Sequence, residues 1–389
     1  MKKDIHSKPF DDGTTVKLEL FKLYLRSWLP VFVERKDKRI EVHDFFAGEG
    51  TDSQGNWGSP LIILDELKSY CSKLIANNTD LLVQFNDASK KKVIHLQINA
   101  NEKLKACTEQ IKYGFCKYDG GKINCPFIIE YNNEDFAHLF SEKFVQFTQS
   151  QSIPRFIFLD QYGIKQINTL VFDQLTSLKQ TDFMFFISSS HIMRFKEVPE
   201  FQKYIDIQKL EFSDKRPSEC HRVIYNYYKS FLGGKNYFLG QFSIKKNSNY
   251  YGIIFGSNNH LGLKKFLDAA WKIDPHTGET NHDIDGDPIR YGQTTMDLFG
   301  TGSQDQIKKL VVFENELIKF LENPQSNGNI YRFALEKGIS IAKTNEILRS
   351  LENRSFLTFT GPERRKGGFY LDFQPTKEIF IQAKWQQQK

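Results

Sequence analysis

Apolar and polar positions in the first part of the chain follow two periods, which predicts an α/β fold. Short apolar runs, typical of buried strands, are separated by longer segments in which apolar residues recur at three- and four-residue steps, as on amphipathic helices. The predicted strands are Ile40–His43, Leu81–Phe85, Phe127–Tyr131, Phe156–Leu159 and Phe183–Ile187, and the predicted helices lie around 14–34, 60–76, 88–113, 134–150 and 165–180. This alternation favours a parallel sheet covered by helices on both faces.

The pattern changes after the fifth predicted strand. Residues 191–236 are polar and helical, which predicts an insertion beside the strand ends. Tyr237–Ile244 and Tyr250–Phe255 are two apolar runs split by a short polar turn, so they predict an antiparallel hairpin at the end of the sheet.

The last part of the chain predicts a separate small domain. Residues 274–305 are rich in Gly, Asp and Thr with little periodicity, as in a linker or surface loop. Three helices are then predicted, followed by two strands around a basic tip: Lys308–Leu321, Asn329–Lys337, Ser340–Glu352, Phe356–Thr360 and Gly368–Phe373. This order predicts a winged helix-turn-helix, and we expect two domains, 1–300 and 301–389, in a chain of 389 residues.

Composition and charge limit the partners and the cellular location that we expect for the protein. The chain carries 53 Lys and Arg against 47 Asp and Glu, a balance of +6 that is compatible with a polyanionic partner without requiring one. It has neither the apolar core of a signal peptide nor an apolar run long enough to span a membrane, so we expect a cytoplasmic protein. The five cysteines are an odd number, and the nine-residue spacing of Cys107, Cys116 and Cys125 is not a zinc spacing, so we expect free thiols and no metal.

The most informative stretch is the end of the first predicted strand. It stops at Asp44 and turns at once into Gly48 and Gly50. Glycine takes positive φ and lets backbone N–H groups approach a ligand. The third glycine of a dinucleotide-binding loop is replaced by Ser53, which favours a ligand with a cationic or neutral head over a pyrophosphate.

The helix after this turn is delayed. Residues 51–57 are polar and turn-like, and the apolar helix begins near Ser59, the predicted N-cap, with Pro60 at the first helical position.

These residues carry a resemblance to a known family. Asp-Phe-Phe-Ala-Gly-Glu-Gly at 44–50 and Gly-Ser-Pro-Leu at 58–61 resemble the opening motif of class I S-adenosylmethionine (SAM) methyltransferases, in particular the three-Cys-motif partner protein family. The resemblance continues at 156–163 and 251–260 and covers roughly residues 14–275. It implies a Rossmann-like methyltransferase sheet, SAM as cofactor and a partner protein encoded nearby. The cysteine motif belongs to that partner, so no cysteine cluster is implied here.

The resemblance also implies cofactor contacts. Asp44 either meets the SAM amino group or orients the turn. Asp87 lies 43 positions later; its carboxylate either accepts the two ribose hydroxyls or caps the next helix. The full set of predicted cofactor residues is Asp44, Phe45, Gly48, Gly50, Ser59, Asp87 and, at the adenine edge, Asn132 and Asn133.

Residues 160–163, Asp-Gln-Tyr-Gly, predict the catalytic turn. They resemble the Asp-Pro-Phe-Gly type of turn in enzymes that methylate base amino nitrogens, which implies that Asp160 accepts a hydrogen bond from the target amine and Tyr162 stacks on the base. Gln161 replaces the proline, which fixes φ and thereby the direction of the carbonyl. Either catalysis persists with a looser turn, or the fold binds without reacting.

Basic residues of the small domain predict contact with nucleic acid. Arg364, Arg365 and Lys366 form the hairpin tip, and Lys343, Asn345 and Arg349 lie on the third helix, where they could approach a groove. Winged helices also dock proteins. The sequence therefore predicts a SAM-dependent methyltransferase acting on a nucleic-acid base nitrogen. The alternatives are a catalytically degenerate relative that binds nucleic acid or a partner enzyme, and, more remotely, a nucleoside or nucleotide enzyme.

Overall fold

A computed structural model shows the chain as two compact units, residues 1–265 and 266–389. It describes residues 8–111, 126–161, 163–287 and 307–384. Tyr162, predicted to stack on the target base, lies outside the described residues, as do Cys116 and Cys125.

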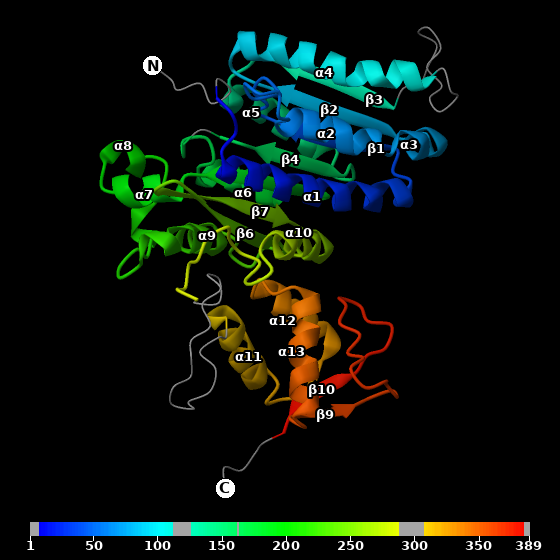
Figure 1. The fold of residues 1–389 in the computed structure, drawn as a ribbon, viewed down its shortest axis with the longest axis vertical. Coiled ribbons are helices and arrows are strands. Elements are labelled where there is room, and N and C mark those ends of the chain that lie inside the picture. Colours follow the sequence, from blue (N-terminus) through cyan, green and yellow to red (C-terminus); the bar gives the residue numbers. More distant parts are fainter. Residues whose placement is uncertain (1–7, 112–125, 162, 288–306, 385–389) are drawn as a thin grey trace. The chain divides into compact units, whose positions relative to one another are not determined.

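The first unit is built on a seven-stranded sheet in the order β3-β2-β1-β4-β5-β7-β6 (Figure 1). The strands are β1 (Arg39–Asp44), β2 (Asp80–Asn86), β3 (Phe127–Asn132), β4 (Arg155–Leu159), β5 (Thr181–Ile187), β6 (Phe238–Lys246) and β7 (Asn249–Ser257). Strands β1 to β5 pair in parallel, and β7 runs antiparallel to β5 and to β6. The predicted Rossmann-like sheet with a terminal hairpin is confirmed, and its strand order reverses between β1 and β4, where sheets of this kind bind ligands.

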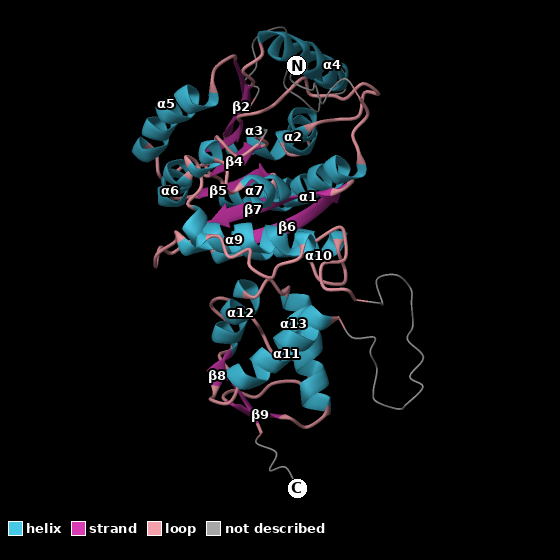
Figure 2. Ribbon diagram, turned by 90° about the vertical axis from the view of Figure 1, so that its left-hand side faces the viewer, coloured by secondary structure: helices cyan, strands magenta, loops and turns pink. Residues whose placement is uncertain are grey.

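Helices cover both faces of this sheet (Figure 2). The helices of the first unit are α1 (Asp12–Arg35), α2 (Ser59–Lys68), α3 (Cys71–Asn77), α4 (Lys90–Ile111), α5 (Phe136–Gln149), α6 (Thr169–Ser177), α7 (Ser189–Phe195), α8 (Pro199–Gln202) and α9 (Cys220–Ser230), with short 3₁₀ turns at Ile207–Lys209 and Pro217–Glu219. Helix α10 (His260–Ile273) begins in the first unit and ends in the second. The single helix predicted around 60–76 is two helices, because the chain turns at Ser69, whose hydroxyl donates to the Glu66 carbonyl (2.6 Å).

Side chains of β4 show how the strand separates two cores. Phe156 and Phe158 point to one face, where their ring centroids lie 5.8 and 4.4 Å from that of Phe21 on α1. Ile157 and Leu159 point to the other face because successive strand side chains alternate.

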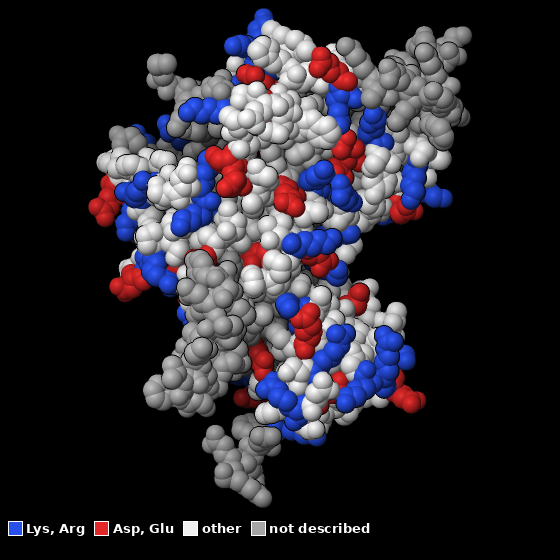
Figure 3. Space-filling view, viewed as in Figure 1, with Lys and Arg blue, Asp and Glu red and all other residues white. Residues whose placement is uncertain are grey.

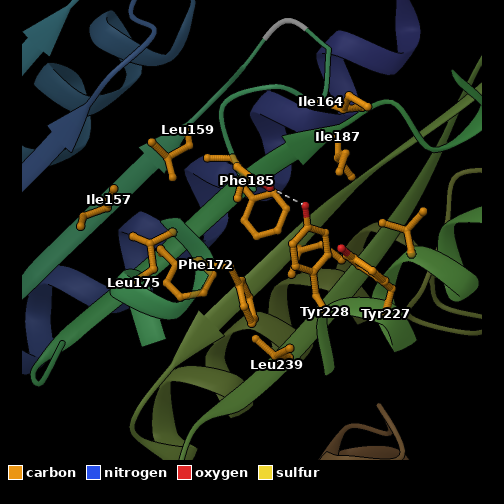
Figure 4. Close-up of a cluster of buried hydrophobic side chains, with 14 of the residues drawn as sticks. Ile157, Leu159, Ile164, Phe172, Leu175, Phe185, Ile187, Tyr227, Tyr228 and Leu239 are labelled. Carbon is orange, nitrogen blue, oxygen red and sulfur yellow. Dashed lines mark hydrogen bonds between the residues drawn. The ribbon is translucent and has the colours of Figure 1, made fainter. Parts of the chain in front are cut away.

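The second core lies between the sheet and helices α5, α6 and α9. Figure 4 shows Phe172, Phe185 and Tyr228 meeting there, and the ring centroids of Phe172 and Phe185 each lie 4.9 Å from that of Tyr228. The Tyr228 hydroxyl donates to the Ile167 carbonyl (2.8 Å), which ties α9 to the segment after β4. This contact helps to fix the chain beside the predicted catalytic turn.

The second unit contains α11 (Lys308–Phe320), α12 (Asn327–Glu336) and α13 (Ile341–Asn353), with a small sheet of β8 (Gln325–Ser326), β10 (Phe380–Ala383) and β9 (Leu357–Thr360) in that order. The strand predicted at Gly368–Phe373 is wrong, because β9 pairs with β10 instead. The Asn327 side-chain amide donates to the carbonyls of Phe369 (3.3 Å), Tyr370 (3.0 Å) and Lys377 (2.8 Å), and these contacts hold an irregular segment in place of a strand.

The predicted linker is a packed loop over 274–287. Asp274, Thr277 and Thr280 are each 3% exposed or less. The Asp274 carboxylate accepts hydrogen bonds from the Thr277 hydroxyl and from the backbone N–H groups of Glu279 (3.2 Å) and Thr280 (3.3 Å). These contacts explain how so polar a segment is buried. Across the described ranges, no helix combines the length and apolarity needed to cross a membrane.

Candidate active site

A pocket of about 560 Å³ opens at the carboxyl ends of β1, β2, β4 and β5, beside the first turns of α1. Its wall combines acids, lysines and aromatic rings. The lining residues include Lys17, Leu18, Phe46, Gly48, Gly58, Ser59, Asp87, Asp160, Gln161, Ile164, Lys165, Phe186, Ser188, His191, Tyr204, Lys246 and Tyr251.

The glycine turn after β1 forms one edge of the pocket. Gly48 and Gly50 have φ of 65° and 85°, the left-handed region that the sequence predicted for them. The Gly58 N–H donates to the Gly50 carbonyl (2.8 Å), which closes the turn, and Gly58 is the N-cap of α2. The prediction of Ser59 as N-cap is wrong by one residue.

Ser59 instead binds Asp44. Its hydroxyl donates to Asp44 Oδ2 (2.6 Å), and the Phe46 N–H donates to Oδ1 (3.1 Å). Asp44 is 1% exposed, and burial raises its pKa to about 7, with the nearby Asp160 charge adding to the rise and the two hydrogen bonds opposing it. Asp44 thus lies behind the pocket wall, and Ser59 and Phe46 lie in it.

Phe45 and the predicted adenine contacts do not line the pocket, although Asn133 Nδ2 donates to the carbonyl of Asp87, which does (2.9 Å). Phe45 is fully buried against Phe136 and Phe140, with ring centroids 5.6 and 5.7 Å apart. Asn132 and Asn133 follow β3, and neither belongs to the described residues that line the pocket.

Asp87 connects the end of β2 to the glycine turn. Its Oδ2 accepts the Gly48 N–H (3.2 Å) and its Oδ1 accepts the Ser89 N–H (2.8 Å). Each oxygen of a carboxylate has a second acceptor position, so two positions remain for a ligand. Asp87 therefore both organises the start of α4 and faces the pocket.

Asp160 follows β4 and forms an ion pair with Lys17 of α1. The side chains are 24% and 8% exposed, and Lys17 Nζ also lies 4.6 Å from the centroid of the Phe186 ring. The contact engages Asp160 Oδ2, which leaves Oδ1 without a hydrogen-bond partner in the described part of the chain. Sequence reasoning missed Lys17, although a lysine at 17 interrupts an apolar helix face that continues at Phe21.

Gln161 anchors the turn after Asp160. It is 2% exposed, and its Oε1 accepts the backbone N–H groups of Gln166 (3.1 Å) and Ile167 (3.3 Å). Because both partners are donors, the oxygen must face them, and the buried Nε2 has no hydrogen-bond partner among the described residues. The side chain thus restrains a turn in which the sequence lacks proline.

Aromatic and basic groups also line the pocket. Phe186, Tyr204 and Tyr251 come from β5, the insertion and β7, so residues far apart in sequence meet there. Ser188 Oγ lies 2.8 Å from His191 Nδ1, and burial together with Arg194 lowers the pKa of His191. Sequence reasoning missed these rings, because the strands and the insertion that carry them are far apart in the chain.

The predicted nucleic-acid residues of the second unit separate into three groups. Arg349, Arg365 and Lys366 line one pocket of about 400 Å³. Lys343 pairs with Glu346 (2.6 Å) near the start of α13, and neither it nor Asn345 lines that pocket. Figure 3 shows Lys and Arg side chains on the visible face of this unit, interspersed with Asp and Glu.

Arg364 is packed inside the segment that carries the tip. Its side chain is 11% exposed, pairs with Glu352, and places its guanidinium carbon 3.3 Å from the centroid of the Phe359 ring.

One further group has side chains of metal-ligand type. Glu134, His138 and Glu142 bring their ligand atoms within 4.8 Å of one another, the first just before α5 and the other two in its first half. His138 and Glu142 are exposed, and the Glu134 and Glu142 carboxylates raise the pKa of His138, as in ordinary helix-surface ion pairs.

No protein-family model matches the chain, and no curated protein matches it. Among solved structures it resembles Trm1 from Pyrococcus horikoshii with S-adenosyl-L-methionine, at 13% identity over 70% of this chain with a TM-score of 0.38; the chain spans 63% of the length of that structure. It also resembles the O-methyltransferase TomG from Streptomyces achromogenes in complex with SAM (8% identity, 64% of this chain and 91% of that one, TM-score 0.32). A third is the O-methyltransferase from Bacillus cereus in complex with SAH (13% identity, 64% and 91%, TM-score 0.30). All three structures contain SAM or SAH and two are O-methyltransferases, and at such TM-scores the likeness carries no further weight.

Proposed function

We propose that the protein is a SAM-dependent methyltransferase that methylates a nitrogen atom of a nucleic-acid base. The observation that carries the proposal is the placement of two carboxylates, Asp87 and Asp160, in one pocket at the switch point of a Rossmann-like sheet. Each keeps free acceptor positions, and they follow different strands, β2 and β4. One can bind a cofactor while the other faces a substrate.

The residues around Asp87 fit SAM. Its remaining acceptor positions suit vicinal ribose hydroxyls, and the glycine turn brings backbone to the pocket edge without side chains. Phe46, Leu18 and Ile164 supply apolar wall, and about 560 Å³ falls within the range of small-molecule pockets. When bound, SAM would supply an electrophilic methyl group.

The residues around Asp160 fit an amino nitrogen as acceptor. Lys17 holds Oδ2, so Oδ1 is free to accept an N–H of the target amine and to orient the nitrogen lone pair. The Gln161 anchor supports a positioned turn despite the missing proline. This observation favours catalysis over the alternative of a degenerate fold that binds without reacting.

A flipped base suits the remaining wall of the pocket. Base-modifying enzymes hold an extruded base between aromatic or apolar side chains, and Phe186, Tyr204 and Tyr251 offer such rings. Lys165 adds positive charge suited to a phosphate, whereas Lys246 is already paired with Asp11 (2.6 Å). We further propose that the second unit contains a winged helix-turn-helix that holds the nucleic acid, and that a partner protein encoded nearby assists.

The first test is calorimetric titration of the whole protein with SAM and SAH. Asp87→Ala should weaken binding by at least about tenfold, the effect of losing roughly one charge-assisted hydrogen bond. Asp173→Ala is the matched control, since Asp173 is 66% exposed, pairs with Lys235 and lies outside the pocket. Absence of SAM binding by the wild type would refute the proposal.

The second test is transfer of labelled methyl groups to tRNA, rRNA and DNA. Asp160→Asn keeps an oxygen for Lys17 but places an NH₂ donor where an acceptor is needed. Turnover should fall about 100-fold or more, with SAM affinity nearly unchanged. SAM binding without transfer to any nucleic acid would favour the degenerate alternative.

A further inference from the structure

We propose that Arg349, Arg365 and Lys366 together bind one phosphate group of a nucleic-acid backbone, and that Arg364 supports this site without contacting the ligand. The inference rests on the proposed function because both name nucleic acid as the partner, but the phosphate site lies in the second unit. The six basic and polar residues predicted from the sequence then have three roles. Arg349, Arg365 and Lys366 contact the ligand, Arg364 supports the site, and Lys343 and Asn345 take no part.

The site is a pocket of about 400 Å³ between α13 and the segment that joins β9 to β10. The lining residues are Arg349, Glu352, Asn353, Arg365, Lys366 and Gly367. The Arg349 Nε lies 3.6 Å from the position that a Cβ on Gly367 would take, so the helix and the tip are in contact and their cations face the same space.

The three cations have no acidic partner within the ranges that the structure describes. The one carboxylate in the pocket, Glu352, is already neutralised, because it pairs with Arg364 and accepts the Gly367 N–H (2.9 Å). Three positive charges therefore converge on a space whose only acid is occupied. Unpaired cations brought together in this way repel one another, and an anion would relieve that repulsion.

Arg364 supplies the support. Its guanidinium is held between Glu352 and the Phe359 ring, and its carbon lies 5.5 Å from the centroid of the Phe369 ring. At 11% exposure it cannot reach a ligand without leaving Glu352 unpaired. It thereby fixes the tip that carries its two basic neighbours.

The chemistry of the pocket favours a phosphate over an acidic protein segment. Two guanidinium forks match the oxygens of a phosphate group, and the ammonium adds a point charge. Protein interfaces bury an apolar centre. The lining of this pocket has no apolar side chain, and the exposed apolar residues of the unit, Val312 and Phe380, lie outside it.

The test is binding of labelled duplex DNA and duplex RNA of equal length to the full chain, at salt concentrations from about 50 to 200 mM. The variants are Arg349→Ala, Arg365→Ala, Lys366→Ala and the triple substitution. Lys384→Ala is the control, since Lys384 is also an exposed lysine of this unit and lies outside the pocket. Arg349, Arg365, Lys366 and Lys384 all carry their charge on flexible side chains. Melting curves confirm that each variant is folded.

The slope of log K against log salt counts the phosphates that the protein neutralises. If the three cations share one phosphate, the triple variant lowers the magnitude of the slope by about 0.9 on duplex DNA, and the single effects are not additive. A fall of about 2.7 with additive effects would mean three separate phosphates and would overturn the shared site. An unchanged slope, no binding by the wild type, or stronger binding to a polyglutamate peptide that the triple variant abolishes would overturn it as well.

Calorimetry with SAM separates the two proposals. If the protein binds SAM and the triple substitution does not change duplex binding, only the phosphate site is refuted. Loss of duplex binding in the triple variant, in a protein that does not bind SAM, refutes only the methyltransferase assignment.

Discussion

Lys17 and Asp160 form an ion pair that joins the first helix to the end of β4, although 143 positions separate them in the chain. Both side chains are largely withdrawn from water, at 8% and 24% exposure, and both line the candidate active-site pocket. The pair fixes the rotamer of the acid that we place beside the target nitrogen. It also attaches α1 to the pocket that its first turns help to form.

Lys17→Met should destabilise the protein, because it leaves Asp160 partly buried without a counter-ion. Breaking a fully buried pair costs about 3–5 kcal/mol, and the exposure of Asp160 reduces the expected loss to about 1–3 kcal/mol. Urea unfolding at pH 7 measures it. The double variant with Asp160→Asn should recover most of the loss.

Lys22→Met is the control on the same helix. Lys22 is 36% exposed, and its partner Glu66 retains Arg26 at 2.7 Å, so the loss should be below about 0.5 kcal/mol. Equal losses for the two variants would show that the Lys17 contact has no special role.

Gln161→Ala should impair methyl transfer while leaving SAM binding intact. It removes the acceptor for the N–H groups of Gln166 and Ile167, so the turn after Asp160 loses its anchor. Misplacement of a reacting group by about 1 Å can reduce rate 100-fold, and we expect at least a tenfold loss of turnover. Single-turnover kinetics with saturating SAM provide the measurement, and a wild-type rate would show that the anchor is dispensable.

Asp44 should make stability depend on pH. Burial raises its pKa from the ordinary 3.8 to about 7, so the folded state keeps a proton that the unfolded chain releases as pH rises through this window. The free energy of unfolding therefore falls with rising pH over that range, by up to about 1.4 kcal/mol per pH unit, and levels off above it.

Asp44→Asn cannot titrate and should flatten this dependence. Urea unfolding of wild type and variant across the same window compares them. Asp173→Asn, at a site 66% exposed, should leave the dependence as in the wild type. A variant at Asp44 with an unaltered pH profile would contradict the assignment of the proton to this carboxyl group.

Arg364→Met and Arg365→Met should differ although the residues are adjacent. The first leaves Glu352, 12% exposed, without its partner and removes the contact with Phe359, so we expect a loss of about 1–3 kcal/mol. The second removes an exposed, unpaired cation and should change stability by less than about 0.5 kcal/mol. Thermal unfolding measures both, and a destabilised Arg365→Met would contradict the division between support and ligand contact.

The sequence by itself determined the five parallel strands of the first unit, their alternation with helices and the terminal hairpin. Periodicity is a local property, and buried strands such as Arg155–Leu159 remain recognisable without knowledge of their neighbours. The left-handed glycines after β1 were also predictable, because positive φ at Gly48 and Gly50 is a requirement of the turn itself.

Only the tertiary structure decided which distant groups meet. No feature of the sequence around Lys17 indicates that it pairs with Asp160. None around Gln161 indicates which backbone N–H groups its side-chain oxygen accepts. Tertiary contacts also decided which strand pairs with β9. Asn327 holds the segment that was predicted to be a strand in an irregular conformation, and β10 pairs with β9 instead. Ion pairs and side-chain anchors depend on three-dimensional proximity and on burial, which strengthens them by excluding water, and neither property belongs to a single stretch of sequence.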